Sequence, residues 1–394
     1  MQGLTVRDGI YWVGSLDRDI KVFDIIMRTE YGTTYNAYIL KGAEKNVLVE
    51  VSKDAFFGEF FERLLSVIDP ADIDYIVLNH SEPDHSGSLK QLLPHCPKAV
   101  VVATGTALRF LKEIVNEEFA SRPIKEGDQI DIGGKTLRFI MAPFLHWPDT
   151  MFTYVPEDKA LFTCDAFGCH YCDDRVFNDL IDGDFLDAYK YYFDNIMGPF
   201  KKNVLDALGK IKGLPIETIC TGHGPVIRRD PQKYIEMYRA WASPAPKSNK
   251  TVVVAYVSAY GYTKRMALSI AAGVKSAGAD VALYDFVAAD ANEAMRAIQE
   301  ADGVLLGSPT LVGDALPPIA NILTQLNPYY NKGKAMGAFG SYGWSGEAVP
   351  NLEARIKELR LPMPVPGLKI NMCPTDAQLK ECEAFGRKFA EALA

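Results

Sequence analysis

The stretch 79–85, Asn-His-Ser-Glu-Pro-Asp-His, is the window of the chain richest in metal-binding side chains. Two imidazoles and two carboxylates lie within six positions: His80, Glu82, Asp84 and His85. Together these groups suit first-row transition metals, and four of them can be shared between two ions. A solvated turn before a helix is the alternative. Since the 394 residues include only six histidines, two of them here favour a metal site.

Four strand-like runs deliver such residues at their carboxyl ends. The apolar run 74–78 precedes the first cluster, and the runs 136–140, 160–164 and 216–221 precede three further candidates. Layered α/β folds place their sites at this edge, so we expect the side chains to converge. A lone histidine is more often a hydrogen-bonded core residue, but the joint pattern favours ligands. Seven ligands suit two metals that share a carboxylate: His80, Glu82, Asp84, His85, His146, Asp165 and His223.

The remaining histidines and a cysteine pair have weaker signals. His95 lies in a polar connection and is predicted to be a surface residue. His170 lies five positions after Asp165 and could support that carboxylate from outside the ligand set. Cys169 and Cys172 form a CxxC pair without a second pair, so we expect plain thiols.

Length and composition narrow the class of protein. A chain of 394 residues predicts two domains. The net charge of −8 gives no electrostatic reason to bind nucleic acid or an anionic membrane. No apolar run is long enough to span a bilayer, and the first residues lack a signal-peptide pattern. Seven scattered cysteines do not resemble a disulfide framework, so a cytoplasmic location is expected.

The second half of the chain follows a Pro/Ser/Lys-rich linker, 243–250. Strand patterns at 251–257, 281–286, 303–307, 335–340 and 368–372 alternate with helix patterns, which predicts a doubly wound parallel sheet. We therefore expect domains at 1–245 and 251–394.

Three loops at the ends of these strands could bind a flavin. The loop 258–263 combines hydroxyls, a glycine and a following helix, which suits one phosphate. It is neither a dinucleotide GxGxxG loop nor a Walker loop, and it resembles the flavodoxin loop that binds flavin mononucleotide (FMN). The two later loops, 307–310 and 340–344, resemble those that flank the isoalloxazine ring in flavodoxins. Tyr342 and Trp344 of the last loop would supply aromatic faces. The candidate FMN residues are Ser258, Ala259, Tyr260, Gly261, Tyr262, Thr263, Ser308, Pro309, Thr310, Ser341, Tyr342, Gly343 and Trp344.

The histidine and carboxylate pattern resembles the metallo-β-lactamase fold and, more narrowly, the flavodiiron proteins. The resemblance implies an N-terminal αββα metallo-β-lactamase-like domain followed by a flavodoxin-like domain. Zinc hydrolases of that fold carry a histidine where this chain has Glu82, and the added carboxylate favours iron. By similarity, His80, Glu82 and His146 would hold one iron and Asp84, His85 and His223 the other. Asp165 would bridge the two.

The resemblance also implies an activity and partners. FMN would pass electrons to a non-haem diiron centre that reduces dioxygen to water, nitric oxide to nitrous oxide, or both. Without a Cys-rich rubredoxin-like extension, the chain resembles the two-domain kind, which takes electrons from a separate donor such as rubredoxin or a reduced deazaflavin. A head-to-tail homodimer, or a dimer of such dimers, would bring the FMN of one chain to the irons of the other.

One stretch departs from the family pattern. Many members carry a histidine over the site from the region before Gly32, but residues 22–28 here read Val-Phe-Asp-Ile-Ile-Met-Arg. The preference between dioxygen and nitric oxide therefore stays open. Two alternatives remain: a zinc-dependent hydrolase with an attached flavodoxin module, which Glu82 argues against, and a non-catalytic electron carrier, which the seven ligands argue against.

Overall fold

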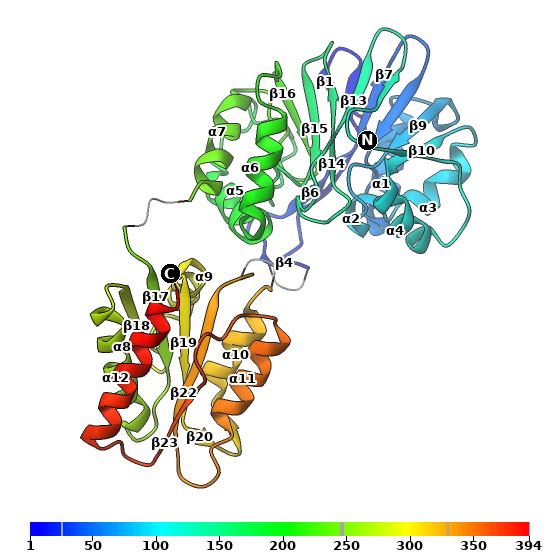
Figure 1. Ribbon diagram of the computed structural model, residues 1–394. Coiled ribbons are helices and arrows are strands. Elements are labelled where there is room, and N and C mark those ends of the chain that lie inside the picture. The colour runs from blue at the N-terminus through cyan, green and yellow to red at the C-terminus, as the bar shows by residue number, and fades with distance from the viewer. Residues whose placement is uncertain (25–26, 245–247, 329–330, 394) are drawn as a thin grey trace. The chain divides into compact units, whose positions relative to one another are not determined.

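The computed structural model describes residues 1–24, 27–244, 248–328 and 331–393 (Figure 1). The chain divides into two compact units, Met1–Pro244 and Ala245–Ala394. Residues 245–247 of the predicted linker lie outside the described residues. So do Ile25 and Ile26, which belong to the stretch 22–28 that differs from the family pattern.

Unit 1 is a sandwich of two sheets (Figure 1). The first sheet has the order β1 (Leu4–Arg7), β2 (Ile10–Trp12), β7 (Tyr38–Lys41), β8 (Asn46–Val49), β9 (Ile73–Val77), β10 (Val100–Thr104) and β11 (Ser121–Ile124). The second has the order β12 (Gln129–Asp131), β13 (Thr136–Met141), β14 (Met151–Val155), β15 (Ala160–Cys164) and β16 (Thr218–Thr221). Side chains of both sheets, among them Trp12, Val49, Phe139 and Phe162, form the core between them.

Helices cover the outer faces of the sandwich. The first sheet is covered by α1 (Phe57–Leu65), α3 (Leu89–Leu92) and α4 (Gly105–Val115), and the second by α5 (Leu186–Tyr192), α6 (Lys201–Lys210) and α7 (Pro231–Ala242). Each turns an apolar stripe inward, such as Leu108 and Leu111 of α4. This αββα arrangement confirms the predicted fold.

Short elements complete unit 1. A single turn, α2 (Pro83–Ser86), carries the end of the histidine-rich stretch. Two small hairpins, β3 (Ser15–Asp17) with β6 (Thr33–Tyr35) and β4 (Val22–Phe23) with β5 (Met27–Arg28), precede β7. The helix pattern near 88–93 forms only α3 and a 3₁₀ turn over Leu93–His95, because Pro94 lacks the N–H that would continue the α-helix.

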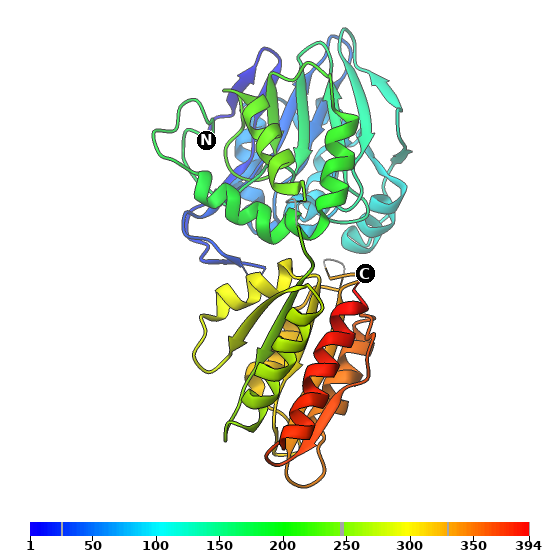
Figure 2. The same ribbon diagram turned by 60° about the vertical axis from the view of Figure 1, so that its left-hand side comes forward.

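Unit 2 is a doubly wound parallel sheet with the order β18 (Asp280–Asp285), β17 (Thr251–Tyr256), β19 (Gly303–Gly307), β22 (Ala335–Tyr342) and β23 (Leu368–Asn371). Helices α8 (Tyr262–Ser276) and α12 (Asp376–Glu391) pack on one face (Figure 2). On the other lie α9 (Ala291–Glu300), α10 (Pro317–Gln325) and α11 (Ala348–Glu358). A hairpin that was not predicted, β20 (Thr310–Leu311) with β21 (Asp314–Ala315), precedes α10.

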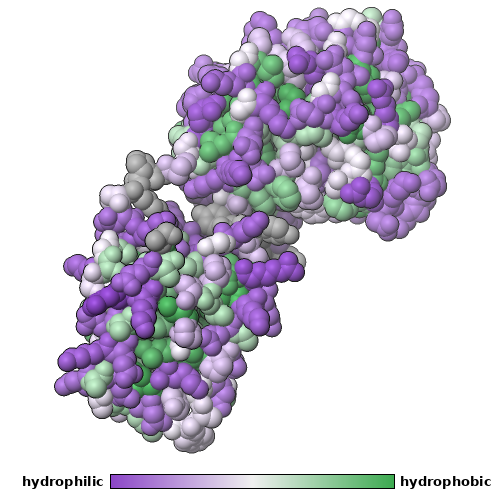
Figure 3. All heavy atoms as spheres, viewed as in Figure 1, coloured by the Kyte–Doolittle hydropathy of each residue, from purple (hydrophilic) through white to green (hydrophobic). Residues whose placement is uncertain are grey.

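The polarity of the surface and the character of the helices are those of an ordinary globular protein. Polar and charged side chains predominate on the face of both units seen in Figure 3, with hydrophobic ones in small groups. Among the described helices, none has the length and apolar character needed to cross a membrane.

Candidate metal centre

The seven predicted ligands converge at one edge of the β-sandwich, where its two sheets meet. The loop after β9, in the first sheet, contributes four of them. The loops after β13, β15 and β16, in the second sheet, contribute His146, Asp165 and His223. Strand order therefore explains why residues up to 143 positions apart lie together. In the second sheet β15 and β16 are neighbours, and only β14 separates β13 from β15.

The first group of ligand atoms surrounds one point. Nε2 of His80 and Nε2 of His146 lie 3.2 and 2.9 Å from Oε2 of Glu82. Both nitrogens lie 3.5 Å from Oδ2 of Asp165. Ligands about 2.1 Å from one ion, at right angles to each other, are about 3.0 Å apart. These four side chains therefore have the spacing that a single metal ion requires.

The second group shares Asp165 with the first. Nε2 of His85 and Nε2 of His223 lie 3.1 and 3.4 Å from Oδ1 of Asp165. The same nitrogens lie 3.3 and 3.0 Å from Oδ2 of Asp84. Oδ1 of Asp165 thus faces one group and Oδ2 the other, which is the geometry of a carboxylate that bridges two metal ions.

The two groups differ in exposure. In the first, the side chains of Glu82 and His146 are 15% and 16% exposed, whereas Asp84, His85 and His223 of the second are 9% exposed or less. Glu82 and His146 are therefore the side chains of the cluster that are most open to solvent.

The carboxylate of Asp84 and the imidazole of His85 favour each other's charged form when no metal is bound. Although burial alone would raise the pKa of Asp84, the neighbouring His85 and His223 lower it to about 2. Burial likewise opposes the charge on His85, but Asp84 and Asp165 raise its pKa to about 10. Oδ1 of Asp84 is buried and has no hydrogen-bond partner among the described residues. A buried charged pair with unused lone pairs fits a site that takes up cations.

Groups outside the predicted ligand set contact two of the imidazoles and act on a third through charge alone. Oδ2 of the buried Asp149 lies 3.3 Å from Nδ1 of His80, and the carbonyl of Thr34 accepts from Nδ1 of His223 at 2.6 Å. Glu50, also buried, is the leading charge that acts on His85 from outside the cluster. Such partners fix which ring nitrogen faces the metal.

Two further side chains flank the cluster. The hydroxyl of Tyr192 donates to Oδ1 of Asp165 at 2.9 Å. His170 is buried, and its Nδ1 pairs with Oγ1 of Thr33 at 2.9 Å. Its ring lies 5.2 Å from that of His223, and burial and this neighbour lower its pKa well below the usual range. The hydrogen bond of His170 therefore goes to Thr33, and the partner of Asp165 is Tyr192.

Sequence reasoning missed several of these residues. Glu50 follows β8 and Asp149 comes three positions after His146, so both lie at the strand edge that bears the cluster. A search for every acidic residue at that edge would have found them. His95 is exposed, as predicted, and both Cys169 and Cys172 are free thiols.

The three predicted flavin loops lie at the carboxyl ends of β17, β19 and β22, which are neighbours in the sheet. Strand order reverses at β17, and ligands of such sheets bind at this switch point. Oγ1 of Thr263 lies 2.8 Å from Oγ of Ser341, which ties the first loop to the third. Gly261 has φ 81°, and a Cβ at this position would meet no atom within 4 Å. The loop therefore leaves open space in front of the helix α8.

Aromatic side chains stand exposed around this space. Trp344 is 97% and Tyr260 is 78% exposed, a large amount of apolar surface for residues of this size. Tyr342 instead packs against Gly346, and Lys369 lies over its ring at 5.5 Å from the centroid. The exposed pair can offer flat faces to an isoalloxazine ring.

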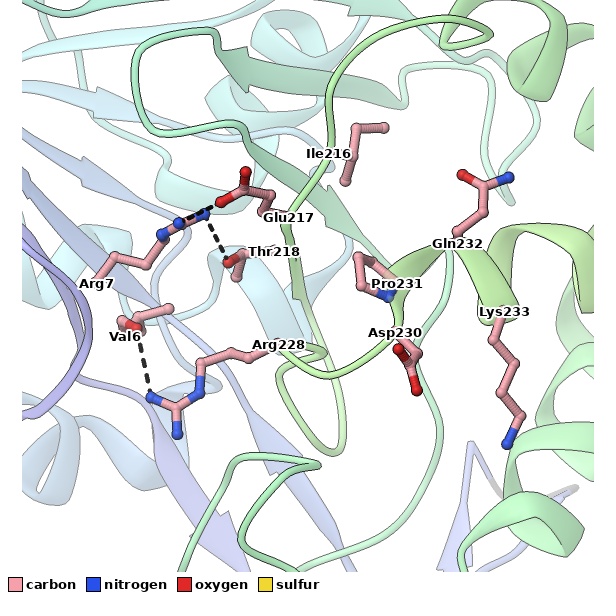
Figure 4. Close-up of a pocket in the computed structure, with 10 residues that line it drawn as sticks. All are labelled: Val6, Arg7, Ile216, Glu217, Thr218, Arg228, Asp230, Pro231, Gln232 and Lys233. Atoms are coloured by element: carbon pink, nitrogen blue, oxygen red, sulfur yellow. Dashed lines mark hydrogen bonds and ion pairs between the residues drawn. The ribbon is translucent and has the colours of Figure 1, made fainter.

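A separate cavity of 690 Å³ lies at the other end of β16 (Figure 4). Arg7, Thr218 and Arg228 line it, whereas the predicted ligand His223 follows the opposite end of the strand. Arg7 pairs with Glu217 at 2.6 Å and Arg228 with Asp179 at 2.8 Å. Both arginines are thus paired with carboxylates, and the cavity is not part of the metal cluster.

An αββα unit with a paired metal cluster, joined to a flavodoxin-like unit, defines a metalloflavoprotein. A family model described as ODP family beta lactamase matches residues 33–224, and a flavodoxin model matches 254–386. The type A flavoprotein fprA of Rhodobacter capsulatus is 42% identical over 99% of this chain and 91% of its own length. The nitric oxide reductase of Moorella thermoacetica is 37% identical over 100% and 99%. The rubredoxin oxygen:oxidoreductase structure of Desulfovibrio gigas matches with a TM-score of 0.75 and 30% identity, over 100% of this chain and 98% of that one.

The chain belongs to the flavodiiron, or type A flavoprotein, family. The predicted resemblance is confirmed, as is the order of the two folds along the chain.

Proposed function

We propose that the chain is a flavodiiron reductase in which FMN supplies electrons to two non-haem irons that reduce dioxygen to water, nitric oxide to nitrous oxide, or both. The observation that carries this proposal is the division of Asp165 between two complete ligand groups. The names of relatives support it, because one is a nitric oxide reductase and one a rubredoxin oxygen:oxidoreductase. None of these names favours the hydrolase alternative.

The proposed ligands follow the two groups. His80, Glu82 and His146 would hold the first iron, Asp84, His85 and His223 the second, and Asp165 would bridge them. Glu82 supplies a hard oxygen donor on the more exposed side of the cluster, which favours iron over zinc and leaves that ion open to a diatomic gas.

The number of electrons suits both gases. Reduced FMN holds two electrons and two ferrous ions hold two more, which together meet the four that dioxygen needs to become two waters. Reduction of two nitric oxide molecules to nitrous oxide and water needs two electrons. We propose the open face beside Trp344 and Tyr260 as the FMN site, and an external donor such as rubredoxin or a reduced deazaflavin as the electron source.

We propose that the functional unit is a head-to-tail homodimer, alone or paired as a dimer of dimers, and that it works in the cytoplasm. The division into two units supports the first point, because FMN and irons of different chains can then meet across a two-fold axis. All seven cysteines are free, which suits a reducing compartment.

Gas-driven reoxidation tests the function. Full-length protein expressed with ample iron is reduced anaerobically and mixed with dioxygen or nitric oxide, while flavin absorbance and metal content are recorded. We expect two irons and one FMN per chain and reoxidation within the turnover time. Stoichiometric zinc, or cleavage of a β-lactam or thioester without reoxidation, would refute the proposal.

Mixed dimers test the crossed arrangement. An Asp165→Ala chain is co-refolded with a chain that carries a bulky residue at Gly261. With random mixing about half of the dimers are mixed, and each keeps one working FMN–iron pair, so roughly a quarter of the wild-type activity should return. Transfer within one chain predicts no recovery.

A further inference from the structure

Cys164, the residue before the bridging carboxylate, is turned toward the metal cluster by the local backbone. It ends β15, where the pairing with β16 changes register between Phe162 and Cys164. Its φ is 50°, in the left-handed region that non-glycine residues seldom adopt. Bulges next to functional sites redirect side chains, and here the strand would otherwise alternate its side chains across the sheet. The residue is buried, with 1% of its surface exposed.

The thiol forms a third cluster of metal-binding atoms. Sγ of Cys164, a ring nitrogen of His85 and a carboxylate oxygen of Asp165 all lie within 4.8 Å of one another, and all three residues are buried. Zinc binds sulfur at about 2.3 Å and nitrogen at about 2.1 Å, so ligand atoms at tetrahedral angles are about 3.6 Å apart. A movement of about 1 Å or less therefore brings the sulfur into bonding distance of an ion on His85 and Asp165.

A second observation is that polar atoms of His85, Asp165 and the neighbouring Asp84 have unused binding capacity. Nδ1 of His85, Oδ2 of Asp165 and Oδ1 of Asp84 are buried and accept or donate no hydrogen bond within the described ranges. Metal binding requires the thiolate form, so a thiophilic ion that binds the sulfur displaces its S–H proton.

We propose that Cys164 is a conditional ligand of the second metal position, which binds zinc-like ions through a Cys164, His85 and Asp165 set while iron uses the oxygen and nitrogen donors alone. The proposal rests on the proposed function, because it takes the second ligand group as a metal position. On binding, the S–H proton leaves to solvent, a metal–sulfur bond forms and no electrons are exchanged.

Ligand softness gives the selectivity. Thiolates favour zinc, cadmium and cobalt over a hard ferric ion, and the carboxylate-rich first group favours iron. A chain starved of iron would therefore hold a zinc-like ion at the deeper, less exposed position. Cys164 would then be the reason that such an ion is slow to leave.

Thiolate binding has an optical signature that does not depend on activity. The full-length protein is stripped of iron with a chelator and titrated with Co²⁺ alone, and then with Cd²⁺ alone. We expect a sulfur-to-metal charge-transfer band in the near ultraviolet that saturates with the first equivalent, because soft ions fill the thiolate position first. Cys164→Ser should abolish this band and weaken Cd²⁺ binding at least about tenfold, the loss that even outer partners of a ligand cause.

Cys169→Ser is the matched control, because Cys169 is an equally buried thiol of the same loop region that lies outside the three-residue cluster. Its band should equal that of the wild type. If Cys164→Ser does not fold, Cys164→Ala takes its place, and the wild-type spectrum decides in either case. Absence of the band in the wild type, or its persistence without Cys164, overturns the proposal. The gas test on iron-loaded wild type is independent, so failure of the reductase assignment is recognised separately.

Discussion

Asp149 offers the sharpest test of how the cluster is held. Its Oδ2 accepts from the backbone N–H and the hydroxyl of Ser81 at 2.8 and 2.7 Å and lies 3.3 Å from Nδ1 of His80. Its Oδ1 has no hydrogen-bond partner among the described residues. Asp149→Asn can therefore place its oxygen at Oδ2 and its amide at Oδ1, which keeps all three contacts, removes the charge and puts the NH2 group where Oδ1 has no partner.

The expected losses are graded. Changing the outer partner of a metal-binding histidine costs about 10–100-fold in metal affinity, or roughly 1.4–2.7 kcal/mol. We expect Asp149→Asn to lie near the lower end, because the ring stays oriented. Asp149→Ala leaves two buried donors of Ser81 and one of His80 unpaired, at about 1–3 kcal/mol each, and should reach the upper end and lower the unfolding free energy by about 3 kcal/mol or more.

Chelator competition with the full-length protein measures the affinity, and urea unfolding of the metal-free protein measures the stability. Asp69→Asn is the control: its Oδ1 accepts from Ala71 N–H at 3.0 Å in the same unit and is not part of the cluster. Because asparagine caps a helix about as well as aspartate, that variant should keep both the stability and the metal affinity of the wild type. Equal affinities for wild type, Asp149→Asn and Asp149→Ala would refute the role of Asp149.

The remaining predictions concern the bridge and a buried acid. Asp165→Ala should abolish gas reduction and keep the flavin spectrum, because the ligands and the flavin loops belong to different units; loss of flavin would contradict this. Burial raises the pKa of Glu50 from its usual 4.5 to about 7, so the metal-free fold binds a proton that the unfolded chain releases, and its stability falls as pH rises from 4.5 to 7. Glu50→Gln keeps both hydrogen bonds from Asn79, which go to Oε1. Its unfolding free energy should exceed that of the wild type by about 3 kcal/mol at pH 8. Parallel curves of unfolding free energy against pH for the two proteins would refute this prediction.

Local sequence was enough to predict the strands that carry the ligands. The run 74–78 and the run 160–164 are apolar and β-branched or aromatic, and the structure forms β9 and β15 there. The residue types after the strand ends indicated a metal site only jointly, because a single histidine such as His223 is more often a core residue. The three flavin loops follow from the same rule in a regular βα alternation.

Strand neighbours and outer partners could not be read from the sequence. Nothing in the run 74–78 says that β9 belongs to one sheet while β13 and β15 belong to the other. The contact of Asp149 with His80 spans 69 positions and depends on that packing. The hairpin β20–β21 has strands of two residues, too short for any periodicity. Tertiary contacts decide all of these features.

The outer carboxylates also bear on why one site can serve two oxidation states. Glu82, Asp84 and Asp165 lie in the two ligand groups, and Glu50 and Asp149 lie directly behind them. Two ferrous ions would carry four positive charges and two ferric ions six, so the five carboxylates, with Glu50 ionised once the metals are bound, would keep the buried centre within one charge of neutral in both states. Burying a large net charge would penalise one state heavily. The two outer acids therefore favour a centre that can pass between both states.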